Sequence, residues 1–317
     1  MFHIFDRVAM KTKAKENLKR NYWGAFLASL LVMLATGSAS LPSFGSSFNV
    51  NFNNSVDTSF PSGSPDVYGG GFAGDQAITF LKIFGIVFGI IFFIAMVASI
   101  VRTIFVSNVF VVGGRRYYLN FSNGSEKLGD IASGFSRDGK MCYWNVVKVM
   151  FRYSLYLALW LLLAFIPLLL MVISIGLLST GQEFLGIMLL FASVGLELVS
   201  FIPYFVKYYE YSMIPYLLAE YPEMTAEEAF AGSKELTKGY KWELFVLDLS
   251  FLGWVLLGTL ALGIGTYFVL PYVEATFAEA YITLCNINKQ KQVLAEQPPV
   301  QPVQMPLQST ETQVGEE

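Results

Sequence analysis

The sequence has little charge for its length. Only 14% of its 317 residues are Asp, Glu, Lys or Arg, whereas ordinary soluble domains contain about 25%. The formal net charge is -3. A nucleic-acid-binding protein needs a basic face to neutralise phosphates, so this charge balance predicts no nucleic-acid partner.

Histidine and cysteine are almost absent. The single histidine, His3, lies near the start of the chain, which argues against Ser-His-Asp or Cys-His catalysis and against a histidine-based metal site. Cys142 and Cys285 lack metal-ligand spacing and are typical of small buried thiols. The sequence also contains no P-loop, dinucleotide fingerprint or zinc helix motif. We therefore expect a protein without a cofactor and without enzymatic activity.

What the sequence does contain is long apolar runs. Hydrophobic residues make up 54% of the chain, and the mean hydropathy is +0.52. An α-helix needs about 20 apolar residues to cross the hydrocarbon core of a bilayer. The pattern predicts an all-α, polytopic membrane helix bundle with six transmembrane helices in residues 23–41, 77–112 (including an extension), 153–180, 184–206, 244–263 and 266–285. The last of these is the weakest, because it contains Pro271, Glu274 and Glu279.

Polar segments separate these runs. We expect a basic amphipathic helix in residues 1–22, a Ser/Asn/Gly-rich extracytoplasmic loop in 42–76, cytoplasmic helix segments in 113–152 and 207–243, and a disordered tail in 286–317. Thr225 and Glu228 form a capping box, and Gly239 is placed to end the helix that they begin. The first span with its basic leader also resembles a cleavable secretory signal, but we favour a retained anchor.

A short motif occurs three times, each time directly before an apolar run. Lys-x-x-x-Trp appears at Lys19 and Trp23, at Lys140 and Trp144, and at Lys238 and Trp242. The first and last copies also share a Lys-Glu pair four residues earlier and a Phe three residues after the Trp. This pattern predicts three related hairpins, each with a cytoplasmic amphipathic helix before its membrane entry.

The basic residues alternate between successive loops. Residues 1–22 hold six, residues 42–76 none, residues 113–152 seven, and the turn after the third span none. Four more lie between the fourth and fifth spans, and two follow the sixth. Under the positive-inside rule, both termini are cytoplasmic. The basic cytoplasmic segments predict contact with anionic lipids of the bilayer.

Several polar residues lie at predicted membrane depth, where ionisable groups are costly. The candidate intramembrane site comprises Glu197, Glu274, Glu279, Arg102 and Asp248. Glu197 is either a neutral structural carboxyl or part of a solute or proton path, in which Arg102 is a possible partner. Glu279 lies on a polar helix stripe that either lines a wet cavity, forms a hydrogen-bonded seam or faces the interface. Gly85 and Gly89 have the spacing of a helix-packing motif.

Four segments resemble one known family: residues 219–222, 233–245, 249–254 and 271–281. They are similar to domain of unknown function 975, a family of uncharacterised integral membrane proteins of Gram-positive bacteria. The resemblance extends from the N-terminus to about Asn288 and implies a protein of the bacterial cytoplasmic membrane. The family has no established activity, so the resemblance assigns no site residue.

Two functions remain open from the sequence. The first is a non-enzymatic component that organises or assists other parts of the cell envelope through membrane-protein partners. The second is a transporter or lipid-handling protein with a polar site at the membrane midplane. A wet cavity that touches Glu197 and Glu279 would favour the second, and a dry, packed bundle would favour the first.

Overall fold

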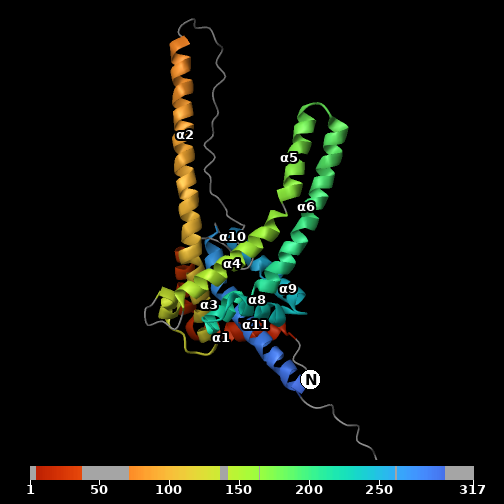
Figure 1. Ribbon diagram of the computed structural model, residues 1–317. Helices are drawn as coiled ribbons and strands as arrows, with labels where there is room; N and C mark the ends of the chain where they lie inside the picture. Colours follow the sequence, from red (N-terminus) through yellow and green to blue (C-terminus); the bar gives the residue numbers. More distant parts are fainter. Residues whose placement is uncertain (1–4, 38–70, 136–141, 164, 261–262, 297–317) are drawn as a thin grey trace, which may run out of the picture.

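The computed structural model describes residues 5–37, 71–135, 142–163, 165–260 and 263–296 (Figure 1). These residues are helical and include no strand, which confirms the all-α fold class. In chain order the elements are α1 (Arg7–Thr36), α2 (Gly71–Arg102), η1 (Thr103–Ser107), α3 (Asn108–Ser122), η2 (Leu128–Phe135), α4 (Tyr143–Leu162), α5 (Phe165–Ser179), α6 (Glu183–Tyr211), α7 (Ile214–Glu220), α8 (Ala226–Thr237), α9 (Lys241–Leu249), α10 (Leu252–Leu260) and α11 (Ile264–Glu296).

The helices divide into a packed base and long projections. Figure 1 shows α2 and the antiparallel pair α5 and α6 rising from a base that contains α1, α3, α8 and α11. The largest fully buried side chains belong to the base, and they include Tyr117, Tyr118, Phe121, Met213, Leu244, Leu247, Phe251, Tyr281 and Leu284. By contrast, the apolar side chains of α2 are largely exposed, including Phe84, Phe88 and Phe92. The protein therefore keeps its own core in the base and presents apolar surface on the projections.

One long rod connects these two parts. α2 continues through η1, a π-helical turn, into α3. The side chains of α2 are largely exposed, whereas many side chains of α3 are buried in the base. Gly113 and Gly114 allow the close approach of η2 and α1, because a Cβ at either position would collide with the Ile131 backbone or the Val32 side chain. Within the predicted cytoplasmic helix segment 113–152, η2 is a 3₁₀-helix.

A non-helical residue stands two positions before each motif tryptophan. These residues are Asn21 (φ -151°, ψ 67°), Cys142 (φ -75°, ψ 90°) and Tyr240 (φ -117°, ψ 5°). The Asn21 side chain accepts the Gly24 N–H at 3.0 Å, as an N-cap does, so α1 bends and restarts there. Cys142, expected to be buried, is exposed at its break. The tryptophans that follow are all exposed: Trp23 (70%), Trp144 (63%) and Trp242 (70%).

Several element boundaries differ from the predicted ones. The predicted span 153–180 is divided into α4 and α5, close to Pro167. α6 continues to Tyr211, beyond the predicted end at 206. α11 extends to Glu296, into the predicted tail, because Asn288 and Lys291 contact Glu235 and Tyr240. Residues 38–70, Lys140 and residues 297–317 lie outside the described residues.

Four helical segments of the described chain are long and apolar enough to cross a membrane, which indicates a membrane protein. They are Lys82–Ser122, Tyr143–Ser179, Glu183–Glu220 and Lys241–Leu260. α1 and α11 are not among them. After its break at Asn21, α1 has about 15 helical residues, or roughly 22 Å at 1.5 Å per residue, which is short of the bilayer core of about 30 Å.

The capping box at the start of α8 is confirmed. The Thr225 hydroxyl accepts the Glu228 N–H at 3.3 Å, and the Glu228 carboxylate accepts the Thr225 N–H at 2.8 Å. This backbone hydrogen bond lowers the pKa of Glu228 below 4.5. The capping interaction therefore stabilises α8 at neutral pH, and it is lost as the pH falls through the folded-state pKa.

Replacing Glu228 tests this pH dependence. We expect Glu228→Gln to lower the unfolding temperature at pH 7, because the neutral amide is a weaker acceptor for the Thr225 N–H. The difference from wild type should shrink as the pH falls below 4.5, where wild-type Glu228 also loses its charge. Thermal unfolding in mild detergent measures it. Glu223→Gln, an exposed carboxylate just before α8 with no ion pair among the described residues, is the control, and an equal effect of both variants would contradict the capping role.

Candidate functional site

A cavity with a mixed polar and apolar lining lies where the projections join the base. Its volume is about 600 Å³, within the range of about 300–1,000 Å³ typical of small-molecule sites. It is lined from α1, the end of α2, η1, α3, α4, α6, α7 and α11. Segments far apart in the sequence therefore meet at this one place.

The cavity contains two cations and one anion. Arg115 of α3 forms an ion pair with Glu274 of α11, and its guanidinium also lies 5.0 Å from the centre of the Tyr216 ring. Arg102, at the end of α2, donates to the carbonyl oxygen of Ala35 at 3.4 Å. Among the described residues, no carboxylate pairs with Arg102. The lining therefore has a net positive charge.

Hydroxyl groups and an amide complete the polar part of the lining. The hydroxyls of Ser29 and Tyr118 are 2.6 Å apart, and Ser107 donates to the Thr36 carbonyl at 3.3 Å. Two buried nitrogens in the lining residues have no hydrogen-bond partner within the described part of the chain: Asn108 Nδ2 and Arg115 Nε. Since buried donors are normally paired, these two nitrogens leave an unmet demand for hydrogen-bond acceptors in the wall of the cavity.

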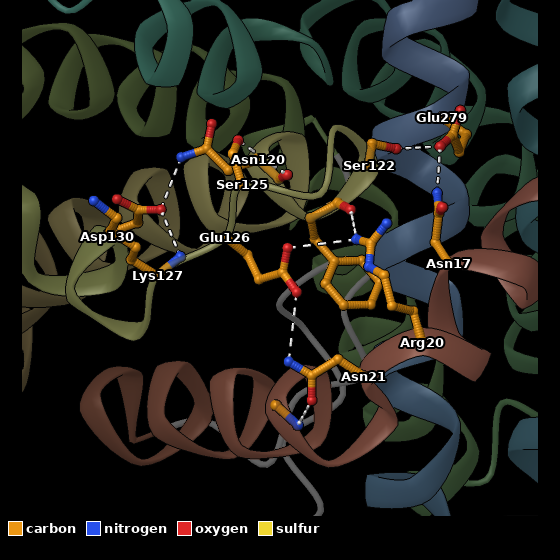
Figure 2. Close-up of polar contacts among 12 residues, drawn as sticks. Asn17, Arg20, Asn21, Asn120, Ser122, Ser125, Glu126, Lys127, Asp130 and Glu279 are labelled. Atoms are coloured by element: carbon orange, nitrogen blue, oxygen red, sulfur yellow. Dashed lines mark hydrogen bonds and ion pairs between the residues drawn. The ribbon is translucent and has the colours of Figure 1, made fainter.

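Glu279 lies outside the cavity, in a seam between three helices of the base. Its carboxylate accepts from Lys13 at 2.8 Å. It also accepts from Asn17 at 3.0 Å and from the Ser122 hydroxyl (Figure 2). The residue is only 1% exposed. With α1, α3 and α11 all contributing, the polar stripe of α11 is a hydrogen-bonded seam at this position.

A second polar cluster fixes the bend of α1. Glu126 lies between Arg20 and Asn21, each 3.4 Å from one of its carboxylate oxygens, and Arg20 also donates to the Phe121 carbonyl (Figure 2). These contacts connect α1 to the C-terminal end of α3. The direction in which α1 leaves its bend is thus determined by the base.

A third buried carboxylate, Glu210 of α6, was not anticipated from the sequence. It is 4% exposed, lies 2.9 Å from Lys207 and pairs with Lys241, while its backbone carbonyl accepts from Ser233 and Thr237. The spacing of Lys207 and Glu210, one helical turn apart, was the available signal. The contacts of Glu210 with α8 and α9 join segments that are far apart in the sequence, so they leave no local sequence pattern.

The structure separates the sequence-predicted site residues. Only Arg102 and Glu274 line the cavity. Glu197 is half-buried in α6, away from Arg102, and Asp248 is buried and accepts from the Tyr209 hydroxyl at 3.0 Å. No described atom lies within 4 Å of a Cβ built at Gly85 or Gly89. Lys19 and Lys238 are exposed, as are the three motif tryptophans.

The cavity residues that the sequence analysis missed are mainly Ser107, Asn108 and Arg115. Ser107 and Asn108 interrupt an apolar run, which is the signal that could have identified them. Their convergence with Ser29, Tyr118 and Glu274 depends on tertiary packing and could not be found from spacing.

Replacing Glu279 and Glu197 distinguishes a structural carboxylate from a dispensable one. We expect Glu279→Leu to lower the free energy of unfolding by about 2–3 kcal/mol, because Asn17 and Ser122 lose a charged acceptor. Glu197→Leu should have little effect, since no described side chain pairs with its carboxylate. Thermal unfolding in mild detergent measures both, and equal stability of the two variants would contradict the role of the seam.

Comparison with known proteins identifies the family. A family model described as "Protein of unknown function (DUF975)" matches residues 1–288, which include the base, the four candidate spans and the cavity. No curated protein and no solved structure matches the chain significantly. Since the match covers most of its length, the chain belongs to the DUF975 family of proteins of unknown function.

Proposed function

We propose that this protein is a lipid-handling membrane protein that holds a membrane amphiphile at the cytoplasmic side of the bilayer. The role is one of binding without catalysis. Of the two functions left open by the sequence, this is the second, but the cavity touches neither Glu197 nor Glu279, so the site that we propose lies at the level of the lipid headgroups instead of the midplane.

The amphiphilic lining of the cavity carries this proposal. One part of the lining is polar and includes Ser29, Tyr118 and Arg115, while another part is apolar and includes Val32, Met33, Leu157 and Leu161. A ligand that satisfies both parts needs a polar head and an apolar body. Soluble solutes meet only the first requirement.

The position of the cavity supports the same ligand class. Near it, α2 and α4 carry exposed apolar side chains, including Val97, Ile100, Leu155 and Leu159. An acyl chain leaving the cavity could follow these surfaces into the hydrocarbon. The polar lining would then be at the depth where headgroups meet water.

Six crossings with both termini in the cytoplasm remain our proposed topology. α1 contacts α3 in the base, whereas α2 begins at the far end of its projection (Figure 1). α10 turns back into α11 at Gly263 (φ 76°), and α11 returns to Lys13 and Glu235 in the base. These paths, with the α5–α6 pair, support three hairpins of like orientation and an internal repeat.

A reporter at the C-terminus tests this topology. We expect a C-terminal alkaline phosphatase fusion to be inactive and a green fluorescent protein fusion to be fluorescent, because the basic end of α11 should stay in the cytoplasm. Both fusions are measured in intact cells. An active phosphatase would mean an odd number of crossings or an inverted orientation.

An accessory role in the cell envelope is the second candidate. It is favoured by how little the four candidate spans pack against the rest of the chain. In the most apolar stretch of each span, only 0%, 12%, 11% and 28% of the residues are buried. Such helices can associate with helices of a partner membrane protein. A stoichiometric protein that co-purifies from native membranes in mild detergent would support this role.

Filling the cavity tests the lipid-handling proposal. We expect wild-type protein, purified from native membranes in mild detergent, to retain about one lipid per chain in mass spectrometry. Ala158→Trp should lose this lipid, because Ala158 lines the cavity and the indole would occupy it. Leu162→Trp is the matched control, since Leu162 belongs to the same helix, is 59% exposed and does not line the cavity. Retention by Ala158→Trp, or absence of lipid from wild type, would refute the proposal.

A further inference from the structure

We propose that the cavity recognises the phosphate of its ligand, with Arg102 as the ion-pairing residue and Asn108 as a neutral donor. This inference rests on the lipid-handling function proposed above and specifies the chemical class of the ligand. It assigns a binding role to the junction between α2 and α3.

The charges of the lining favour an anion. Arg115 is neutralised by Glu274, and both side chains are mostly buried, at 18% and 15% exposure. Arg102 has no carboxylate partner in the described part of the chain, so its charge is the one left uncompensated. A half-buried guanidinium gains most from a ligand that is itself charged and accepts hydrogen bonds.

The unpartnered atoms of the lining point to the same chemistry. Both of them, Asn108 Nδ2 and Arg115 Nε, are donors, and Asn108 is only 7% exposed. A buried donor without a partner destabilises the protein, so a group that supplies only acceptors would relieve this deficit. Phosphate oxygens are such acceptors, whereas the ammonium of a zwitterionic headgroup would add further donors.

The backbone brings these donors to the cavity. η1 lies between Arg102 and Asn108, and its wider π-helical turn changes the angular relation of the residues on either side. Thr103, Ser107 and Asn108 thereby line the same cavity as Arg102. π-Helical turns occur often at functional sites, because they direct side chains that a regular helix would separate.

Capping of α1 is the competing role for Arg102. Its guanidinium contacts the carbonyl of Ala35 and lies beside Gly37, the left-handed residue that ends α1 (φ 64°). The contact is long, at 3.4 Å, and arginine has five N–H donors, so most of its hydrogen-bonding capacity is unused. A role confined to capping would affect stability without affecting the choice of lipid.

The experiment measures lipid selectivity. Purified full-length wild type is equilibrated with mixed micelles that contain equal amounts of phosphatidylglycerol and diacylglycerol, which lacks the phosphate, and the bound lipids are quantified by native mass spectrometry. We expect enrichment of phosphatidylglycerol by wild type. Arg102→Gln should reduce this enrichment by about tenfold, the scale of one lost charged hydrogen bond. Arg102→Lys should retain most of it, and Asn108→Leu should reduce it as well.

Lys82→Gln is the matched control, since it removes one positive charge from the same helix far from the cavity. It should keep the selectivity of wild type. Stability is followed for every variant by thermal unfolding, so a destabilised Arg102→Gln is interpreted only alongside Arg102→Lys. An Arg102→Gln protein that unfolds earlier but keeps the enrichment would show that Arg102 only caps α1 and would overturn the inference.

The remaining outcomes separate the two proposals. If wild type binds both lipids equally, the phosphate inference fails while lipid handling stands. If wild type binds neither lipid, lipid handling fails. Competition with inorganic phosphate then identifies the source of the anion: displacement of bound phosphatidylglycerol would mean that the phosphate group alone is recognised, and no displacement would mean that the whole headgroup and its chains are required.

Discussion

The carboxylate of Glu279 holds together three helices that the chain brings from its beginning, middle and end. Lys13 and Asn17 reach it from α1 and Ser122 from α3, so one buried acceptor determines how these helices lie against α11. Burial of a charge is tolerated only when its partners are in place. The surrounding aromatic core, with Tyr117, Phe121 and Tyr281, can pack closely only in this arrangement.

This arrangement explains why the base and the projections differ so much. In lipid, apolar side chains gain little from burial against one another, because the hydrocarbon is as apolar as leucine. The projections therefore have no strong reason to pack within the chain, and α2 stands apart from α5 and α6 (Figure 1). Specific tertiary structure is concentrated where polar groups and tyrosines can be satisfied. The cavity lies at the boundary between the packed base and the apolar projections.

Local sequence patterns predicted those features of the fold that depend on residues close together in the chain. The apolar runs gave the helices α2, α4, α5, α6 and α10, and Thr225 with Glu228 gave the start of α8, because a cap depends on residues three positions apart. The break at Asn21 was not predicted, although asparagine is a good N-cap, because the apolar pattern continues across it. Lys-x-x-x-Trp marked the three places where such breaks occur.

The candidate site was much less predictable. The cost of an ionisable group in lipid selected Glu197, Glu274 and Glu279 equally, but only tertiary packing decides which of them pairs with arginine, which forms a seam and which stays at the helix surface. Glu210 was missed although its partner Lys207 is only one helical turn away, and its other partner, Lys241, is 31 residues away and left no local pattern. Arg102 and Glu274 were recognised as unusual residues, while their common cavity depends on eight elements meeting.

The rod formed by α2, η1 and α3 is one structural unit in two environments: α2 exposes apolar side chains, and α3 is packed in the base. Its first half needs little more than hydrophobicity, so many apolar sequences could replace one another there. Its second half requires particular shapes, since Gly113 and Gly114 admit neighbours that any larger side chain would displace. The π-helical turn sets the angular offset between the two halves. Substitutions in α2 can therefore accumulate with few consequences, whereas the deletion of one residue in η1 would rotate the lipid-facing half relative to the base without changing either half itself.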